Sequence, residues 1–327
     1  MTMAALWMDD EMQMLAHVSV MPNEVTEAVA PRSGGVYIDA TLGAGGHTEA
    51  MLLRCPDIRV IAFDRDEQAL VAASERLAPF AGRVDFRHAA YECIPEHLVE
   101  LGIERVDGLI ADLGISSLQL DLADRGMSFR AAGPIDMRMD QSQGETALEL
   151  IARLSQDELA NLIYEYGEDR ASRRIARCIS QAYERAELHT TLDLRRAVVR
   201  AVGPRRVGGV DPATRTFQAL RIAVNGELEQ LDRLLAFAPE ILAESGVIAI
   251  LSFHSLEDRR IKRAFLDGAS WQRLTKKPLV ATVEEQHKNP RSRSAKLRAA
   301  ERLGAGETLS PDELLDTETP PPPRVVT

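Results

Sequence analysis

Short apolar runs alternate with amphipathic stretches along the first third of the chain. The runs "GVYIDA", "RVIAF", "VDFRH" and "VDGLIADLG" are typical of buried strands, and helical patterns begin at Thr48, at Glu67 and near Glu96. Parallel strands need crossover connections, and helices of this length supply them. The pattern therefore predicts an α/β fold with a doubly wound, Rossmann-like sheet, whose ligand sites lie at the carboxyl ends of the strands.

This rhythm stops after "DLGISS" and returns about a hundred residues later. Residues 118–213 have helical patterns, with a capping box at Ser155 and Glu158 and further helices over 172–185 and 191–202. A helix, the strand "GVIAILSF" and the helix "LEDRRIKRAF" follow. We therefore predict a discontinuous core of residues 17–117 and 214–302 and an inserted helical domain, 118–213, for substrate recognition. Residues 1–16 form an N-terminal extension, and the proline-rich residues 303–327 are expected to be disordered.

Size and composition favour a globular protein of the cytoplasm. The chain has 327 residues and 45% hydrophobic content, enough for one large core and a second unit. No run approaches the roughly 20 apolar residues of a membrane helix, and acids stand where a signal peptide has lysines. The three cysteines, Cys55, Cys93 and Cys178, are far apart. Neither a disulfide framework nor a metal site is predicted.

Charge is unevenly distributed along the chain. The net charge is −11, yet residues 170–221 hold 12 Lys/Arg against 4 Asp/Glu, a net of +8. Residues 259–302 hold 13 against 4, a net of +9. This segregation favours a basic face that meets nucleic acid, because local potential steers association more than total charge does. Solvated helix faces are the alternative explanation.

A glycine turn and two acids indicate a cofactor site. Gly43, Gly45 and Gly46 follow the first predicted strand and lead into a helix, so a ligand can approach the backbone there. Asp64 ends the second strand, where a carboxylate suits ribose hydroxyls in NAD and S-adenosylmethionine enzymes alike. "GAGGH" lacks the full G-x-G-x-x-G spacing, and Asp112 at the end of the fourth strand can pair with an ammonium or an amine. These spacings favour S-adenosylmethionine but leave NAD open.

The motifs in order resemble those of the bacterial small-subunit ribosomal RNA cytosine-N4 methyltransferases, the RsmH or MraW family. The similarity runs from "HVSV" through "DATLGAGGHT", "DGLIADLGISSLQLD", "RGMSF", "GPIDMRMD", "FQALRIAVN" and "SFHSLEDR" to "NPRSRSAKLR". It implies S-adenosylmethionine as methyl donor, a Rossmann-like methyltransferase sheet with a helical insertion, and the N4 amine of one cytosine in the decoding region as target. The family's cofactor contacts fall on Gly45, Gly46, His47, Asp64, Tyr91, Asp112 and Gln119. Tyr91 stands where phenylalanine is more common, and Leu118 where proline is usual.

The reaction needs an acceptor for the attacking amine. Related amine methyltransferases carry a Pro-Pro pair in the loop after the fourth strand, but "DLGISS" has none. The acceptors must therefore come from Asp112, Ser116, Ser117 or backbone carbonyls, with Asp112 as the candidate catalytic residue. His254 could suggest a hydrolase triad with Ser255, but adjacent residues leaving a strand point to opposite faces.

Further substrate contacts are predicted on two segments. Arg221 and Asn225 share a helix face with Gln218, which suits a substrate wall or a structural network equally well. Arg291, Arg293 and Lys296 lie in a stretch that can meet RNA phosphates or pack back on the domain. His254 completes this set of candidates.

Two other classes of protein share some of these features. A nicotinamide-dependent oxidoreductase would share the glycine turn and Asp64. A non-catalytic RNA-binding assembly factor would need only the basic segments. The expected partner is small-subunit ribosomal RNA or the assembled subunit, rather than DNA or a membrane, and the sequence does not determine the oligomeric state.

Overall fold

The computed structural model describes residues 19–204 and 210–304. The predicted N-terminal extension and nearly all of the predicted tail lie outside these residues. The chain divides into two compact units: residues 115–233 form one, and the segments on either side of them form the other. Within residues 19–204 and 210–304, no helix combines the length and the apolar character that crossing a bilayer requires.

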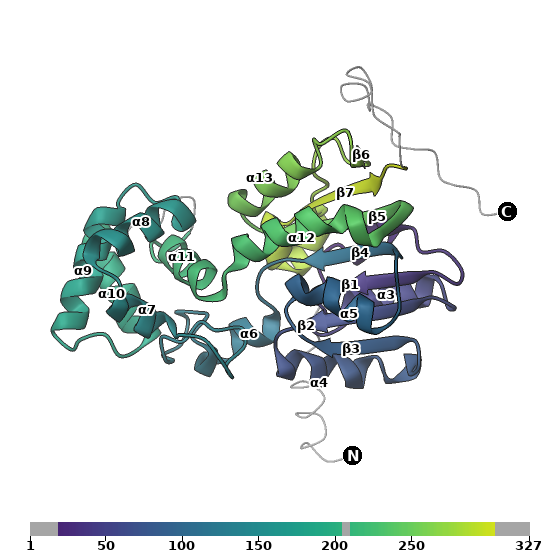
Figure 1. Cartoon of the computed structure of the whole chain (residues 1–327). Helices are drawn as coiled ribbons and strands as arrows, with labels where there is room; N and C mark the ends of the chain where they lie inside the picture. Colours follow the sequence, from purple (N-terminus) through teal and green to yellow (C-terminus); the bar gives the residue numbers. More distant parts are fainter. Residues whose placement is uncertain (1–18, 205–209, 305–327) are drawn as a thin grey trace, which may run out of the picture. The chain divides into compact units, whose positions relative to one another are not determined.

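The first unit is built on a seven-stranded sheet of order β3-β2-β1-β4-β5-β7-β6 (Figure 1). Strands β1 to β5 are parallel to one another, and β7 pairs antiparallel with β5 and β6. The strands are β1 (Val36–Asp39), β2 (Arg59–Asp64), β3 (Val84–His88), β4 (Val106–Asp112), β5 (Leu242–Ser252), β6 (Trp271–Arg273) and β7 (Lys296–Arg302). The predicted α/β fold is confirmed, including the four parallel strands of the first third.

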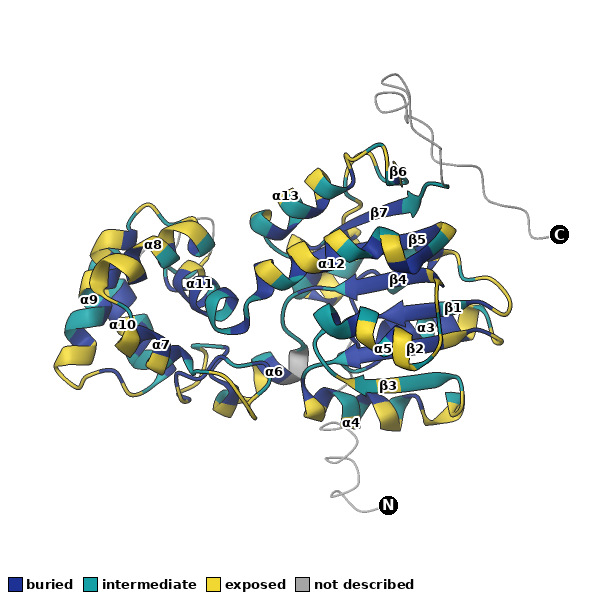
Figure 2. Ribbon diagram, in the orientation of Figure 1, coloured by how far each residue is buried: buried dark blue, intermediate teal, exposed yellow. Residues whose placement is uncertain are grey.

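The central strands are apolar because helices cover the sheet on both sides. Ile38, Ile61 and Leu109 are fully buried, and Figure 2 shows the inner strands almost entirely in the colour of buried residues. The helices of this unit are α2 (Pro22–Val29), α3 (Gly46–Arg54), α4 (Glu67–Arg76), α5 (Ile94–Glu100), α13 (Ser255–Ala264) and α14 (Val283–Lys288). Helix α2 and strands β6 and β7 were not predicted. In the case of β7, the sequence mixes cations with alanines and has no apolar run that would indicate a strand.

The second unit is helical and has its own hydrophobic core. Its helices are α6 (Ser117–Asp121), α7 (Ala147–Arg153), α8 (Gln156–Gly167), α9 (Ser172–Glu184), α10 (Thr191–Val202) and α11 (Thr214–Asn225). The predicted capping box is present, since Ser155 accepts from the Glu158 N–H and the Glu158 side chain accepts from the Ser155 N–H. Equivalent boxes start α7 and α10.

The boundaries of the helical unit differ from the predicted 118–213. The first boundary follows Gly114, close to the prediction, but the second follows Arg233. Helix α11 was expected to belong with the sheet, yet it packs in the helical core through Phe217 and Leu220. Helix α12 (Glu227–Ile241) spans this second boundary. An amphipathic helix does not reveal from its sequence which core its apolar face joins.

Candidate functional site

The candidate site begins where the parallel strands end, at one edge of the sheet (Figure 1). Asp39, Asp64 and Asp112 are the last residues of β1, β2 and β4. Because the carboxyl ends of parallel strands share an edge, the topology brings these acids to the same rim. Tyr91 opens a short 3-10 helix just after β3 and is buried. The predicted cofactor residues of the first unit therefore gather at one rim.

Asp64 fixes the glycine turn to the second strand. Its Oδ2 accepts the Gly43 N–H at 2.8 Å, and its Oδ1 accepts the Asp66 N–H at 2.9 Å. Gly43 and Gly45 have φ angles of 52° and 79°, which favour glycine, and α3 begins directly afterwards. Burial raises the pKa of Asp64 to about 6. A carboxylate has about four lone-pair sites, so it can still accept ribose hydroxyls.

His47 has one ring nitrogen committed to the protein. Its Nε2 lies 2.9 Å from the Val20 carbonyl oxygen, which can only accept, so Nε2 carries the proton. Nδ1 then lies toward Asp112, 3.8 Å from Oδ2. Burial lowers the pKa of His47, which favours this neutral form. Asp39, next to it, accepts from the Thr48 hydroxyl at 2.7 Å.

Asp112 has an unsatisfied oxygen. The main-chain N–H of Asp112 donates to the Thr41 hydroxyl at 2.6 Å. The side-chain Oδ1 is buried, and it has no hydrogen-bond partner within the described part of the chain. Burial, and then the charge of Glu257, raise the pKa of Asp112 to about 7. A buried acceptor without a donor is costly, so a ligand that brings an ammonium or an amine would stabilise this group. The site therefore fits the methionine end of S-adenosylmethionine.

Ser116 and Gln119 belong to the helical unit. The Ser116 N–H donates to Gln119 Oε1 and the Gln119 N–H donates to Ser116 Oγ, both at 3.2 Å. This reciprocal pair fixes the start of α6, and Gln119 is buried. The side chains of Ser117 and Leu118 lie outside the described residues. Cofactor and amine contacts by these residues stay predictions.

Arg221 and Asn225 are both held within the helical unit. Arg221 makes a two-pronged ion pair with Glu227, at 2.8 and 3.0 Å. Asn225 is buried; its Oδ1 accepts the Met139 N–H and its Nδ2 donates to the Met137 carbonyl, both at 2.8 Å. These contacts give both residues a structural role, and their contact with substrate stays a prediction.

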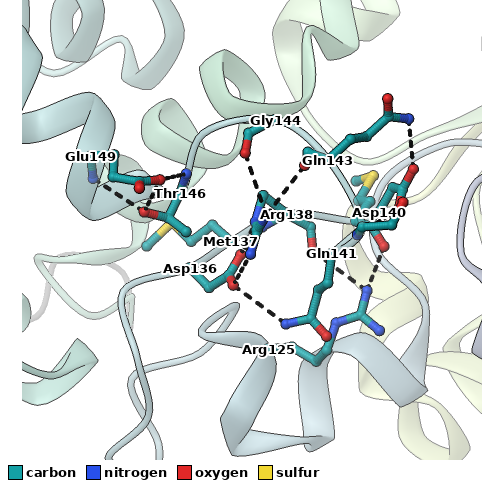
Figure 3. A network of polar contacts seen from close by, with 12 residues as sticks. Arg125, Asp136, Met137, Arg138, Asp140, Gln141, Gln143, Gly144, Thr146 and Glu149 are labelled. Carbon is teal, nitrogen blue, oxygen red and sulfur yellow. Dashed lines mark hydrogen bonds and ion pairs between the residues drawn. The ribbon is translucent and has the colours of Figure 1, made fainter.

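The loop that Asn225 holds was not assigned a role from its sequence, "RGMSFRAAGPIDMRMD". Arg138 pairs with Asp136 (Figure 3), with N–O distances of 2.8 and 2.9 Å. The Arg125 guanidinium donates to the Met139 carbonyl. A Cβ on Gly133 would lie 1.9 Å from the Ala123 carbonyl oxygen, so only glycine fits there. The loop thus has a defined structure of its own. The glycines, aspartates and arginines clustered in its sequence could have indicated this structure.

The remaining candidates lie in the first unit. His254 caps α13: its Nδ1 accepts the Glu257 N–H at 3.4 Å, and its Nε2 lies 3.1 Å from Glu257 Oε1. Arg293 is exposed in a 3-10 helix that also contains Arg291. Lys296 starts β7 and pairs with Asp258 at 2.9 Å. Their contacts with RNA stay predictions.

Comparison with known proteins identifies the family of this chain. A model of the MraW methylase family matches residues 14–303. This chain belongs to the MraW methylase family. The ribosomal RNA small subunit methyltransferase H of Sorangium cellulosum strain So ce56 is 64% identical over 294 residues, 90% of this chain and 93% of that protein. Its namesake from Synechocystis sp. strain PCC 6803 is 50% identical over 88% of this chain and 93% of its own.

The resemblance predicted from the motifs is therefore confirmed. Membership of a methylase family favours the methyltransferase interpretation over the oxidoreductase alternative. Among solved structures the similarity is weaker: an rRNA-methylase from Clostridium thermocellum described as putative aligns with TM-score 0.41 and 12% identity over 89% of this chain and 99% of that one. The family assignment does not depend on it.

Proposed function

We propose that this protein transfers the methyl group of S-adenosylmethionine to the exocyclic N4 amine of a cytosine in the decoding region of small-subunit ribosomal RNA. The observation that carries the proposal is the buried Asp112 Oδ1, which lacks a donor among the described residues at the rim where Asp64 holds the glycine turn. The names of the relatives support the RNA target, and the predicted residues Gly45, Gly46, His47 and Tyr91 support the cofactor. A ribosomal RNA substrate supports a location in the cytoplasm.

The chemistry is a direct displacement. The bound donor supplies an electrophilic methyl group on a sulfonium. The amine nitrogen forms the new C–N bond as the S–C bond breaks, the bonding pair stays on sulfur, and the amine loses one proton. Because the amine lone pair is delocalised into the cytosine ring, an acceptor that binds an amine hydrogen frees it for attack. Asp112 in its ionised form is such an acceptor, and its raised pKa suits proton transfer near neutrality.

Calorimetric titration separates this function from its rivals. We expect S-adenosylmethionine and S-adenosylhomocysteine to bind and NADH not to bind. Incubation with labelled donor and small-subunit ribosomal RNA should then yield methylated cytidine on nucleoside analysis. NADH binding without S-adenosylhomocysteine binding would favour an oxidoreductase. RNA binding without any donor binding would favour an assembly factor.

A variant tests the role of Asp112. Asp112→Ala should reduce single-turnover methyl transfer more than it reduces donor affinity if the carboxylate touches the amine. Equal losses would mean that Asp112 holds only the cofactor. Unchanged binding and turnover in a folded variant would remove it from the site.

A further inference from the structure

Helix α9 presents a row of arginines on the side opposite to its buried face. Ile175, Ile179 and Ala182 are buried in the helical core. Arg174, Arg177 and Arg185, which follows the last helical residue, are all exposed. Figure 2 shows exposed positions along this helix.

The spacing of the three arginines makes them a single row. Arg177 and Arg185 follow Arg174 by three and eleven residues, offsets that place Arg177 about 60° to one side of Arg174 and Arg185 about 20° to the other. The row extends over about 16 Å of helix axis. Within the described helix α9, the only acid is the exposed Glu184, between the second and third arginines.

These arginines have no acidic partner, whereas their neighbours have one. Among residues 19–204 and 210–304, no hydrogen bond or ion pair involves the guanidinium of any member of the row. By contrast, Arg173 on the same helix pairs with Asp157 at 3.4 Å. On α10, Arg196 pairs with Asp193 and Arg200 with Glu187. Arg173, Arg196 and Arg200 are thus paired with acids, whereas the row is available for another anion.

Arg174 of the row does not stabilise the helix that carries it. Helix α9 has no side-chain cap and no acid in its first turn, and Arg173 and Arg174 lie there instead. The N-terminus of a helix is its positive end, so cations there are unfavourable. An anion supplied from outside the unit would remove this repulsion.

We propose that Arg174, Arg177 and Arg185 bind the phosphate backbone of the RNA substrate, and this inference rests on the proposed function. A guanidinium matches a phosphate with two parallel N–H donors, and a row along one helix suits successive charges on one strand. Such contacts fix the position of the RNA without reading its sequence.

The test is the salt dependence of RNA binding. The probe is a transcript of small-subunit ribosomal RNA, with affinity measured from low to physiological salt. Each phosphate contact on a single strand contributes about 0.7 to the slope of log affinity against log salt. Changing Arg174, Arg177 and Arg185 together to Gln should flatten that slope by about 2. In steady-state methyl transfer KM should rise with little change in kcat, while calorimetric affinity for S-adenosylmethionine stays unchanged.

The matched control changes the three paired arginines, Arg173, Arg196 and Arg200, to Gln. It removes the same formal charge from the same unit and should leave the slope close to that of the wild type. A row variant that folds and keeps the wild-type slope overturns the inference, as does a control that flattens the slope equally. If the row binds a protein of the assembled subunit instead of RNA, the row variant will keep the wild-type slope with the transcript. If the wild-type protein neither binds nor methylates the transcript or the intact subunit, the proposed function itself fails.

Discussion

The carboxylates at the ends of the parallel strands differ in the number of hydrogen bonds that they accept from the protein. Asp64 accepts two main-chain N–H groups, whereas the Oδ1 of Asp112 has no donor within the described residues. The first is therefore a structural anchor that can also bind a ligand, and the second is an acceptor left for one. Burial raises the pKa of both, so their ionisation is coupled to ligand binding.

Asp64→Ala should weaken binding of S-adenosylmethionine. The change removes a charged acceptor for ribose hydroxyls and releases the Gly43 N–H, at a cost of about 1.5 to 3 kcal/mol, or roughly tenfold to a hundredfold in affinity. Calorimetry on the folded variant measures the loss. Asp64→Asn, which keeps one acceptor oxygen, should lose less. A dissociation constant unchanged in Asp64→Ala would refute the ribose assignment.

Donor affinity should also rise with pH through the titration of Asp112. Its pKa in the ligand-free protein is raised to about 7, and an ammonium binds the ionised form. Between pH 6 and 7.5 the ionised fraction rises from about one tenth to about three quarters, which predicts a roughly eightfold gain in affinity. His47, Asp39 and Glu257 are the neighbouring titratable groups.

Calorimetry at several pH values checks this dependence against Asp112→Asn, which cannot ionise. The variant should lose most of the rise and keep only a shallow one below pH 6.5. This remainder comes from Asp64, whose pKa is about 6. A variant profile that matches the wild type would assign the titration to another group.

Pairs of elements are fixed by buried charge as well as by apolar packing. Asp258 on α13 accepts from Arg298 at 2.6 Å and from Lys296 at 2.9 Å, both on β7. Burial alone would raise the pKa of Asp258, but these hydrogen bonds outweigh it and hold the pKa below its ordinary value. This carboxylate thus stabilises the fold above its unfolded pKa, and its contribution is lost as the pH falls.

Asp258→Ala should destabilise the first unit strongly. Arg298 has a side chain only 7% exposed, so removing its partner leaves a buried charge uncompensated, at a cost of about 3 kcal/mol. Urea unfolding followed by circular dichroism measures the change. The control is Glu284→Ala, which breaks an ion pair with Lys288 whose two side chains are 77% and 75% exposed and should change little. Equal midpoints for Asp258→Ala and the wild type would contradict a structural role for this contact.

At the scale of the whole molecule, the sheet is assembled from segments on either side of the helical unit. Strand β5 pairs with β4 across the intervening chain, with Leu109 opposite Ile248 and Asp112 opposite Leu251. The rim of the site therefore depends on the complete sheet, and donor binding should stabilise the unit as a whole.

S-adenosylmethionine at 100 times its dissociation constant should stabilise the unit that binds it by about 2.7 kcal/mol. In hydrogen exchange, protection should increase over residues 39–66, where main-chain N–H groups bind Asp64. Helix α9 serves as the internal control, because the proposed donor site includes none of its residues. Protection that rises equally in α9, or an unchanged melting temperature, would count against a donor site at this rim.

The sequence by itself determined the parallel strands, the glycine turn, and the positions of Asp64 and Asp112 at strand ends, whereas their contacts with the donor stay predictions. These features are local: a continuous apolar run predicts a strand buried on both faces, and its last residue lies at the ligand edge. Only the tertiary structure decided that α11 joins the helical core, that β7 is a strand, and that Asp258 binds Lys296 and Arg298. The paired and unpaired arginines of the helical unit were likewise indistinguishable in sequence. Pairing depends on which acids the packing of the helices brings near each guanidinium. A count of charges along the sequence does not contain these distances.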